Sequence, residues 1–227
     1  PQIRFGADPA WPPFDFIDAQ GRHKGMASDI LKLLAERIGF EFVLEPNLTW
    51  QEVLGSARNR TLDIAPCLAA TPEREGYLNF TQPYTYVPWV IVTRKDFRSI
   101  QDLGDLTNDR LVMVEGYAVT ELTRQAYPDL RIRTVKSPMD GLKAVATGQV
   151  DAYAGNLGVI SYLIQEKNLT NLKVASGTGF EDQPLRIGVR SDWPQLLSIL
   201  NKGLASVTRE EMNAIRQKWI PLNVEPS

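Results

Sequence analysis

Short apolar runs alternate with segments of helical periodicity along the whole chain. Residues 3–7 (IRFGA) have the length and composition of a buried strand, and residues 26–40 then carry apolar side chains at helical spacing. Gly39 follows the last of these periodic positions, where a helix commonly ends. Because such strands and helices alternate from one end of the chain to the other, the pattern predicts an α/β fold.

The same pattern places the remaining elements. Further strands are predicted at residues 41–46, 62–67, 89–94, 110–116, 130–135, 150–156, 172–176 and 185–190. Further helices are predicted at residues 49–60, 118–127, 137–149, 157–167, 191–207 and 208–220, the second of them ending before Pro128. Four residues at the starts of these helices carry N-cap side chains: Thr49, Ser137, Ser191 and Thr208. Glu52 stands where it would complete a capping box with the first of them.

Two segments of the chain have the same layout. Residues 58–71 (RNRTLDIAPCLAAT) and 147–159 (TGQVDAYAGNLGV) each run from a helix end through a polar turn into a hydrophobic–Asp–small strand and a loop. The identity is too low for a sequence repeat, but the layout predicts two lobes of similar build. Open α/β sheets bind ligands at the carboxyl ends of their strands, so two facing lobes would leave a binding cleft between them.

Composition and charge exclude several classes of protein. The 227 residues have a formal net charge of −2 and a pI near 5.6, which indicates no basic surface for nucleic acid. Cys67 is the single cysteine and His23 the single histidine, so an internal disulfide is excluded and the usual zinc spacings are missing. No apolar stretch approaches the roughly 18 residues of a membrane span. We expect no metal site and no cofactor.

Three segments carry a resemblance to a known family. They are residues 7–31 (ADPAWPPFDFIDAQGRHKGMASDIL), 62–84 (LDIAPCLAATPEREGYLNFTQPY) and 148–156 (GQVDAYAGN). These segments resemble the family-3 periplasmic solute-binding proteins, which have the Venus-flytrap fold, and the likeness covers nearly the whole chain. Details such as VEGYAV and REEMNAIRQKWI are most similar to the extracytoplasmic sensor domains of bacterial histidine kinases.

The resemblance implies a particular architecture. It is the type II periplasmic-binding-protein fold, in which two α/β lobes are joined by two crossing strands. The crossings are expected near residues 92–94 and 184–186. Lobe 1 is then discontinuous, with residues 1–92 and 186–227, and lobe 2 holds residues 93–185.

Arg74 is the main candidate for binding an anion. A buried strand leads into Thr-Pro-Glu-Arg, so Thr71 is expected to cap a helix whose first turn holds Arg74. A guanidinium there can make a two-pronged bond to a carboxylate, and the resemblance implies that this arginine holds the carboxylate of the ligand. The alternative is a surface arginine that pairs with Glu73 or Glu75.

Other residues of lobe 1 are candidates through the same resemblance. Cys67, Leu68 and Ala69 stand where the family often has hydroxyl side chains for the ligand carboxylate; their backbone N–H groups can still donate, and the thiol suits a small buried residue. Asp8 is placed beside a ligand ammonium group, although it could equally serve a turn. Two tryptophans are implied as aromatic walls of the site: Trp11 and Trp50. The second of them could instead be a core contact.

Lobe 2 contributes a turn and an asparagine. The turn holds Gly116, Tyr117 and Ala118, where amino-acid binders commonly have threonines. The backbone N–H donors of the turn are kept, but the threonine hydroxyl groups are replaced by a tyrosine and an alanine side chain. Asn156 stands where such binders usually have an aspartate that pairs with the α-ammonium group. A neutral amide weakens the case for a standard amino acid and favours a carboxylate with a polar or aromatic body, while Asp8 could still hold an amine.

These residues lead to one main hypothesis about function. The chain is expected to be a periplasmic sensor domain that closes on a small carboxylate or amino-acid-like solute and signals to a downstream domain of the same chain, such as a histidine kinase. The full protein would be membrane-anchored and could form a homodimer. A free binding protein of an amino-acid ABC transporter is the alternative, and a dehydratase-type enzyme is a weaker one, because Asn156 cannot act as an acid. No catalytic residue is expected.

Overall fold

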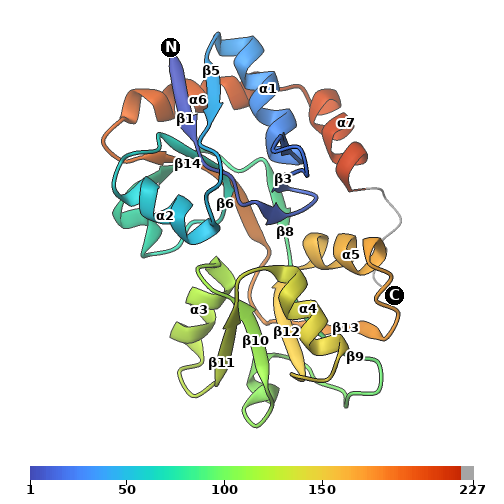
Figure 1. Cartoon of the computed structure of the whole chain (residues 1–227). Coiled ribbons are helices and arrows are strands. Elements are labelled where there is room, and N and C mark those ends of the chain that lie inside the picture. Colours follow the sequence, from blue (N-terminus) through green and yellow to red (C-terminus); the bar gives the residue numbers. More distant parts are fainter. Residues whose placement is uncertain (221–227) are drawn as a thin grey trace. The chain divides into compact units, whose positions relative to one another are not determined.

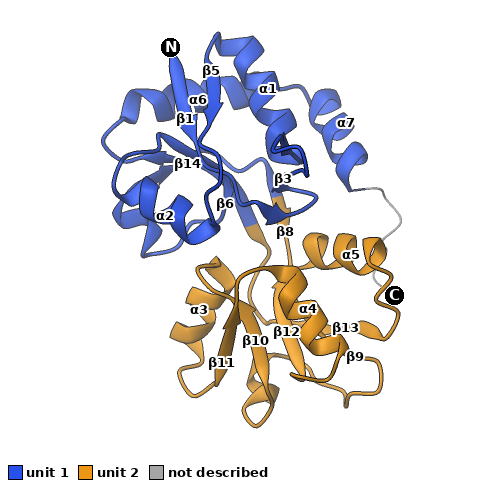
Figure 2. Ribbon diagram, in the orientation of Figure 1, with its two compact units in different colours: residues 1–85, 184–227 blue, residues 86–183 orange. Residues whose placement is uncertain are grey.

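The computed structural model describes residues 1–220; residues 221–227, which the expected first lobe includes, lie outside the described part. The chain forms two compact units (Figure 2). Unit 1 holds residues 1–85 and the segment from residue 184 onward, and unit 2 holds residues 86–183. The chain therefore passes between the units at two places.

Unit 1 is built on a mixed six-stranded sheet in the order β5-β1-β6-β14-β7, with β8 paired to β14 (Figure 1). The strands are β1 (Gln2–Phe5), β5 (Glu41–Leu44), β6 (Ile64–Leu68), β7 (Leu78–Phe80), β8 (Thr85–Val87) and β14 (Gln183–Arg190). The helices are α1 (Met26–Ile38), α2 (Trp50–Arg58), α6 (Pro194–Ser206) and α7 (Arg209–Trp219), with a 3₁₀ turn, η1 (Arg74–Gly76). A small antiparallel sheet holds β2 (Ala10–Trp11), β3 (Asp15–Ile17) and β4 (His23–Lys24).

Unit 2 is built on a five-stranded sheet in the order β11-β10-β12-β9-β13. The strands are β9 (Trp89–Arg94), β10 (Leu111–Val114), β11 (Ile132–Val135), β12 (Ala152–Asn156) and β13 (Leu172–Gly177). The helices are α3 (Ala118–Ala126), α4 (Pro138–Ala146) and α5 (Leu157–Glu166), with a 3₁₀ turn, η2 (Leu103–Leu106). Because β10 and β12 are neighbouring parallel strands, the segments that follow them begin at the same edge of the sheet.

The first passage between the units lies earlier in the chain than the family resemblance implies. Residues 92–94, where a crossing was expected, lie inside β9, which pairs with β12 and β13 in the sheet of unit 2. The passage falls at Thr85 and Tyr86, inside the three-residue strand β8, and the return falls at Gln183 and Pro184 in β14. A strand of three residues is too short for a periodic pattern to reveal it.

Local signals place most of the helix ends correctly. Thr49 and Glu52 form the predicted capping box of α2, and the hydroxyl of Ser137 caps α4 as predicted. Gly39 ends α1 in the left-handed conformation, with a φ of 68°. The prediction for Ser191 is wrong, because α6 begins only at Pro194, a residue whose fixed φ suits the first helical position.

The predicted likeness of the two lobes extends to one side-chain arrangement, an aspartate held between two arginines. In unit 1 Asp63, directly before β6, accepts hydrogen bonds from the backbone N–H of Arg4 (2.8 Å) and from its Nη2 (3.0 Å). Arg190 of β14 donates to the same carboxylate through Nη1 at 3.2 Å. We call this the Arg–Asp–Arg clamp of unit 1.

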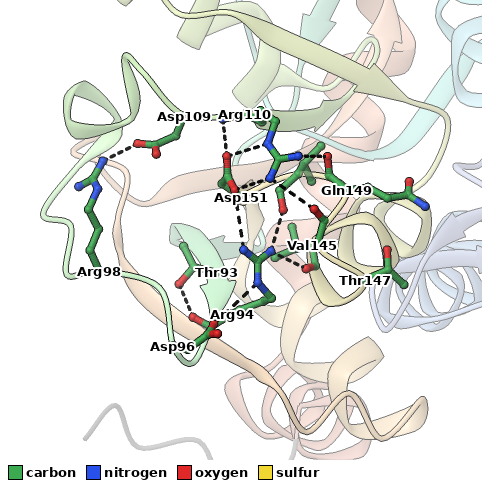
Figure 3. Close-up of polar contacts among 12 residues, drawn as sticks. Thr93, Arg94, Asp96, Arg98, Asp109, Arg110, Val145, Thr147, Gln149 and Asp151 are labelled. Atoms are coloured by element: carbon green, nitrogen blue, oxygen red, sulfur yellow. Dashed lines mark hydrogen bonds and ion pairs between the residues drawn. The ribbon is translucent and has the colours of Figure 1, made fainter.

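Unit 2 contains the equivalent clamp (Figure 3). Asp151, directly before β12, accepts from the backbone N–H of Arg110 (2.9 Å) and from its Nη2 (2.8 Å). Arg94 of β9 is the second arginine, with Nη2 at 3.8 Å from the carboxylate, and it also donates to the carbonyls of Val145 and Val150. The two clamps therefore fix the starts of β6 and β12. The opposite ends of these strands carry candidate site residues.

Candidate functional site

The candidate site of unit 1 begins at the carboxyl end of β6. Cys67 and Leu68 are the last two residues of this buried strand, and Ala69 follows it at 6% exposure. Burial, and then the nearby Asp15 carboxylate, raise the pKa of the Cys67 thiol well above its usual value. The hydroxyl of Tyr84 donates to the carbonyl of Pro66 at 2.6 Å, directly beside this cysteine. Cys67 is thus a small buried residue with a protonated thiol, as the sequence indicated.

Arg74 is buried, with only 2% of its surface exposed. Its Nη1 donates to the carbonyl of Ala69 at 2.8 Å, and its guanidinium carbon lies 5.6 Å from the ring centroid of Trp50. Glu73 pairs instead with Arg58 at 2.6 Å. The alternative of a surface arginine paired with its glutamate neighbours is therefore wrong.

The local backbone at Arg74 differs from the predicted helix start. Thr71 does accept a hydrogen bond from the backbone N–H of Arg74 at 3.2 Å, as a cap would. However, the segment that follows is the three-residue 3₁₀ turn η1, which is too short to act as an anion-binding helix terminus. The guanidinium itself, rather than a helix dipole, is the positive group at this place.

Asp8 lies in a network of buried polar groups. Its Oδ1 accepts from the backbone N–H of Ala10 at 2.9 Å, which is the turn role that the sequence left open. Its own N–H donates to Oδ2 of Asp15 at 2.9 Å, and Oδ1 of Asp15 lies 2.6 Å from Nε2 of His23. Asp15 and His23 thus hold the loop of Asp8 in place. Sequence reasoning missed both, although both stand inside the first segment that carries the family resemblance.

The two tryptophans of unit 1 have different settings. Trp50 is the first residue of α2 and is 7% exposed, so it belongs to the core while its ring also lies beside Arg74. Trp11 is half-buried in β2 and contacts Phe14 with ring centroids 5.3 Å apart. Of the two residues, only Trp11 is partly exposed.

The candidate residues of unit 2 lie at the carboxyl ends of β10 and β12. Gly116 has a φ of 78°, which turns the chain from β10 into α3 at low cost only for glycine. Tyr117 is the N-cap residue of α3, and its side chain makes no capping hydrogen bond. Ala118, the first helical residue, is 7% exposed. The neighbouring strand ends in Asn156, so the fold brings these four predicted residues to one edge.

Asn156 is buried, with 4% exposure, and its Oδ1 accepts from the backbone N–H of Val159 at 3.1 Å. The side chain is therefore the N-cap of α5, a role that the sequence analysis did not consider. In the sheet Asn156 pairs with Trp89, which is 5% exposed and contacts Phe180 edge-on at 5.7 Å. Sequence reasoning also missed Trp89, because nothing in the local pattern links it to residue 156.

Two kinds of feature are missing from the described chain. Among residues 1–220, no group of three or more His, Cys, Asp or Glu side chains is arranged to hold a metal ion. None of the helices described here is long and apolar enough to span a bilayer.

Comparisons with known proteins give a consistent picture. Residues 3–222 match the bacterial extracellular solute-binding proteins, family 3. The virulence sensor protein BvgS of Bordetella bronchiseptica is 29% identical over 207 residues, which are 91% of this chain but only 17% of BvgS. A solved histidine kinase sensor domain with similarity to periplasmic binding proteins is 26% identical at a TM-score of 0.89, over 97% of this chain and 96% of that one. The ABC transporter arginine-binding protein 1 of Escherichia coli K12 is 25% identical over 228 residues, 97% of this chain and 91% of that protein.

Proposed function

We propose, on the premise that this chain belongs to the bacterial extracellular solute-binding proteins of family 3, that it is a ligand-binding sensor domain. It has the two-lobed Venus-flytrap fold of the periplasmic binding proteins and works outside the cytoplasm. The sensor relatives BvgS and the histidine kinase sensor domain support this choice within the family. The rest of the signalling protein, its anchoring in a membrane and its pairing into a dimer belong to the same proposal.

One observation carries the ligand part of the proposal, the burial of the Arg74 guanidinium at the end of β6. A cation with 2% exposure is stable only among hydrogen-bond acceptors and anions, because burial removes its hydration. Here the carbonyl of Ala69 and the face of Trp50 orient the guanidinium. A planar guanidinium in this position can form a two-pronged, charge-assisted bond with a small carboxylate, including that of an amino acid.

Binding is coupled to closure of the two lobes in this proposal. A ligand shifts a conformational equilibrium only by its difference in affinity for the two states. Contacts that the ligand makes only in the closed state therefore drive the closure. Hinge closure of this kind is an established switching mode of periplasmic binding proteins.

The last described helix, α7, is suited to pass the change onward. None of its residues is buried, and it is tied to α1 by polar contacts. Nζ of Lys218 and Nε1 of Trp219 both donate to Asp29, at 2.9 and 2.8 Å. Arg216 donates to the carbonyl of Tyr84 at 3.0 Å, directly before β8, where the chain leaves unit 1. Arg216 therefore links α7 directly to the residue that precedes this passage.

The alternative is a free binding protein that delivers its solute to a transporter. The similarity to the arginine-binding protein, which extends over 91% of that protein, favours this alternative. The pocket would be the same in both cases. The full-length gene decides between them, because a following kinase or transmembrane segment supports the sensor, and a signal peptide with a stop codon after Ser227 supports delivery.

We assign no catalytic step to the domain. A dehydratase needs an acid placed to protonate a leaving hydroxyl group. Asn156 has no proton to give for this purpose, and the Asp8 carboxylate already accepts from the backbone of its own loop. Incubation with prephenate or arogenate should therefore yield no product.

The proposed ligand contact is tested by thermal shift in a screen of carboxylates and amino acids. A ligand at one hundred times its Kd stabilises the native state by about 2.7 kcal/mol, which raises the Tm of a chain of this size by about 5–10 °C. We expect Arg74→Ala and Arg74→Lys to remove this rise, since alanine lacks the charge and lysine lacks the planar fork.

The controls separate loss of binding from loss of folding. Arg58→Ala removes an exposed arginine of the same unit and should leave the ligand-induced rise unchanged. Arg74→Gln keeps most of the side-chain volume, and its far-UV circular dichroism should match that of the wild type. A full ligand-induced rise in all three Arg74 variants would remove this residue from the site.

A further inference from the structure

We propose that a groove beside α7 is a docking surface for a polypeptide partner, a segment in which two carboxylates flank an apolar side chain. The groove lies within unit 1, between residues 82–84, the end of α6 and one side of α7, and its volume is about 330 Å³. The proposal concerns a partner polypeptide and not the solute, so it is independent of the proposed function.

One side of α7 lines the groove, and other positions of the same helix attach it to α1. Residues 209, 212, 213 and 216 follow one another at spacings of three, one and three, so they share one side of the helix. Glu211 pairs with Arg37 at 2.5 Å, and Lys218 pairs with Asp29 at 2.9 Å. The contacts that hold α7 in place therefore do not use the side along the groove.

The base of the groove is apolar and only partly covered. Leu204 at the end of α6 is 6% exposed, whereas Pro83, Val207 and Met212 are half-buried. Burial of such surface against an apolar side chain is favourable, and an unbranched methionine adapts to the shape of what it contacts. The groove thus offers a place for an apolar side chain of a partner.

The groove also carries positive charge that its own lining does not balance. Its described lining residues include Arg209 and Arg216 but no aspartate or glutamate. Arg209 is exposed and pairs with no carboxylate among residues 1–220, and Arg216 donates to the carbonyl of Tyr84, which has no net charge. A cation at the first position of a helix gains nothing from the helix dipole, so α7 itself does not account for Arg209. Carboxylates of a partner supply the complementary charge.

The spacing of the two arginines favours an extended polypeptide as the occupant. Arg209 and Arg216 are seven positions apart on α7, which corresponds to about 10 Å along the helix axis. Three residues of extended chain cover the same distance at roughly 3.3 Å each, so acids at positions i and i+3 match both arginines. Basic clusters that bind anionic membranes have roughly four to eight Lys or Arg side chains, and the described lining of this groove has two.

The test is an NMR titration of the isotope-labelled 227-residue chain with three acetylated peptides. Their sequences are Gly-Asp-Leu-Leu-Glu-Gly, Gly-Asn-Leu-Leu-Gln-Gly and Gly-Lys-Leu-Leu-Lys-Gly, which share the apolar residues and differ in charge. We expect the acidic peptide to shift the amide signals of residues 82–84 and 204–216 at millimolar concentrations. The other two peptides should bind at least about fivefold more weakly, and added salt should weaken the binding of the acidic one.

Arg209→Glu is the decisive variant. It reverses the charge at an exposed position, and a glutamate in the first turn suits the helix dipole, so α7 and the Tm of the free protein should be preserved. Affinity for the acidic peptide should fall at least about fivefold. The matched control is Lys202→Glu, which makes the same change of charge at an exposed residue of α6 outside the groove and should leave the affinity unchanged.

Three results would overturn the inference. The first is the absence of shifts with the acidic peptide, or equal shifts with the neutral one, since the arginines would then select no partner segment. The second is binding of phosphatidylglycerol vesicles or of succinate through Arg209 without a response to the acidic peptide, which would assign the surface to a membrane or a small acid. The third is much tighter peptide binding by a chain that ends at Ile220, which would assign the groove to the protein's own last residues.

Discussion

Cys67 illustrates how burial sets the chemistry of a single residue. The thiol is 2% exposed, and desolvation raises its pKa well above the usual range, so little thiolate exists at neutral pH. We expect iodoacetamide to leave the folded protein unmodified over hours. The same reagent should add one carbamidomethyl group per chain in denaturing urea. Mass spectrometry of the intact protein measures both.

The unfolded sample is the control for reagent activity, because it exposes the same thiol. Modification of the native protein at the rate seen in urea would mean that the end of β6 opens readily. That result would also weaken the site of unit 1, which relies on the same strand end for Leu68 and Ala69.

At the scale of elements, α4 depends on a glycine for its close approach to β12. A methyl group at Gly141 would lie 2.6 Å from Cδ2 of Tyr153, inside the van der Waals contact distance. We expect Gly141→Ala to destabilise the protein by about 1–3 kcal/mol, because overpacking outweighs the better helix propensity of alanine. Urea unfolding followed by circular dichroism measures the change.

Gly55 in α2 provides the matched control. No atom lies within 4 Å of a methyl group at this position, so the substitution changes only the intrinsic helix propensity. Gly55→Ala should stabilise the protein by roughly 0.5–1 kcal/mol. Equal effects of the two substitutions would show that Tyr153 moves aside and that α4 is not held by this contact.

At the scale of the whole molecule, the same Arg–Asp–Arg clamp is built once in each unit. Burial raises the pKa of Asp63, but hydrogen bonds from Arg4 and Arg190 lower it by more, so the net pKa lies below its usual value. Hydrogen bonds from Arg110 likewise lower the pKa of Asp151. Both carboxylates thus bind protons less readily in the folded chain than in the unfolded one.

The lowered pKa values of Asp63 and Asp151 determine how the stability of the protein depends on pH. The contribution of each clamp is complete above the unfolded pKa of about 3.9 and is lost as the pH falls through the lower folded pKa. We expect the Tm of the wild type to fall steeply below about pH 4. Asp63→Asn should lower the free energy of unfolding by about 1–3 kcal/mol at pH 7, because charge-assisted hydrogen bonds are lost. The same variant should show a smaller fall of the Tm between pH 4 and pH 3 than the wild type. Differential scanning calorimetry from pH 7 to pH 3 measures both.

Two further variants check this prediction. Asp129→Asn changes an exposed carboxylate of unit 2 and should leave the acid slope as it is in the wild type. Asp151→Asn should add to the effect of Asp63→Asn, because the two clamps share no residue. An unchanged acid slope in the double variant would show that the clamps do not govern acid stability.

The sequence by itself determined the features that depend on neighbours along the chain. The alternation of strands and helices reflects side-chain periods, and the caps at Thr49, Ser137 and Thr208 depend on groups within three residues. The repeated hydrophobic–Asp–small strand was visible for the same reason, and it indicated two lobes of one build. Local signals failed where strands have two or three residues, as in β2 and β8, because no period can develop there.

Only the tertiary structure decided what the candidate side chains contact. It buried Arg74 beside Trp50 and used the Asn156 oxygen to cap α5. It also joined Arg4 to Asp63 across 59 positions of the chain. The physical reason is that strand register and packing, which no local pattern encodes, set the direction and the surroundings of each side chain. The candidate residues could be named from the sequence, whereas the groups that they offer a ligand depended on the fold.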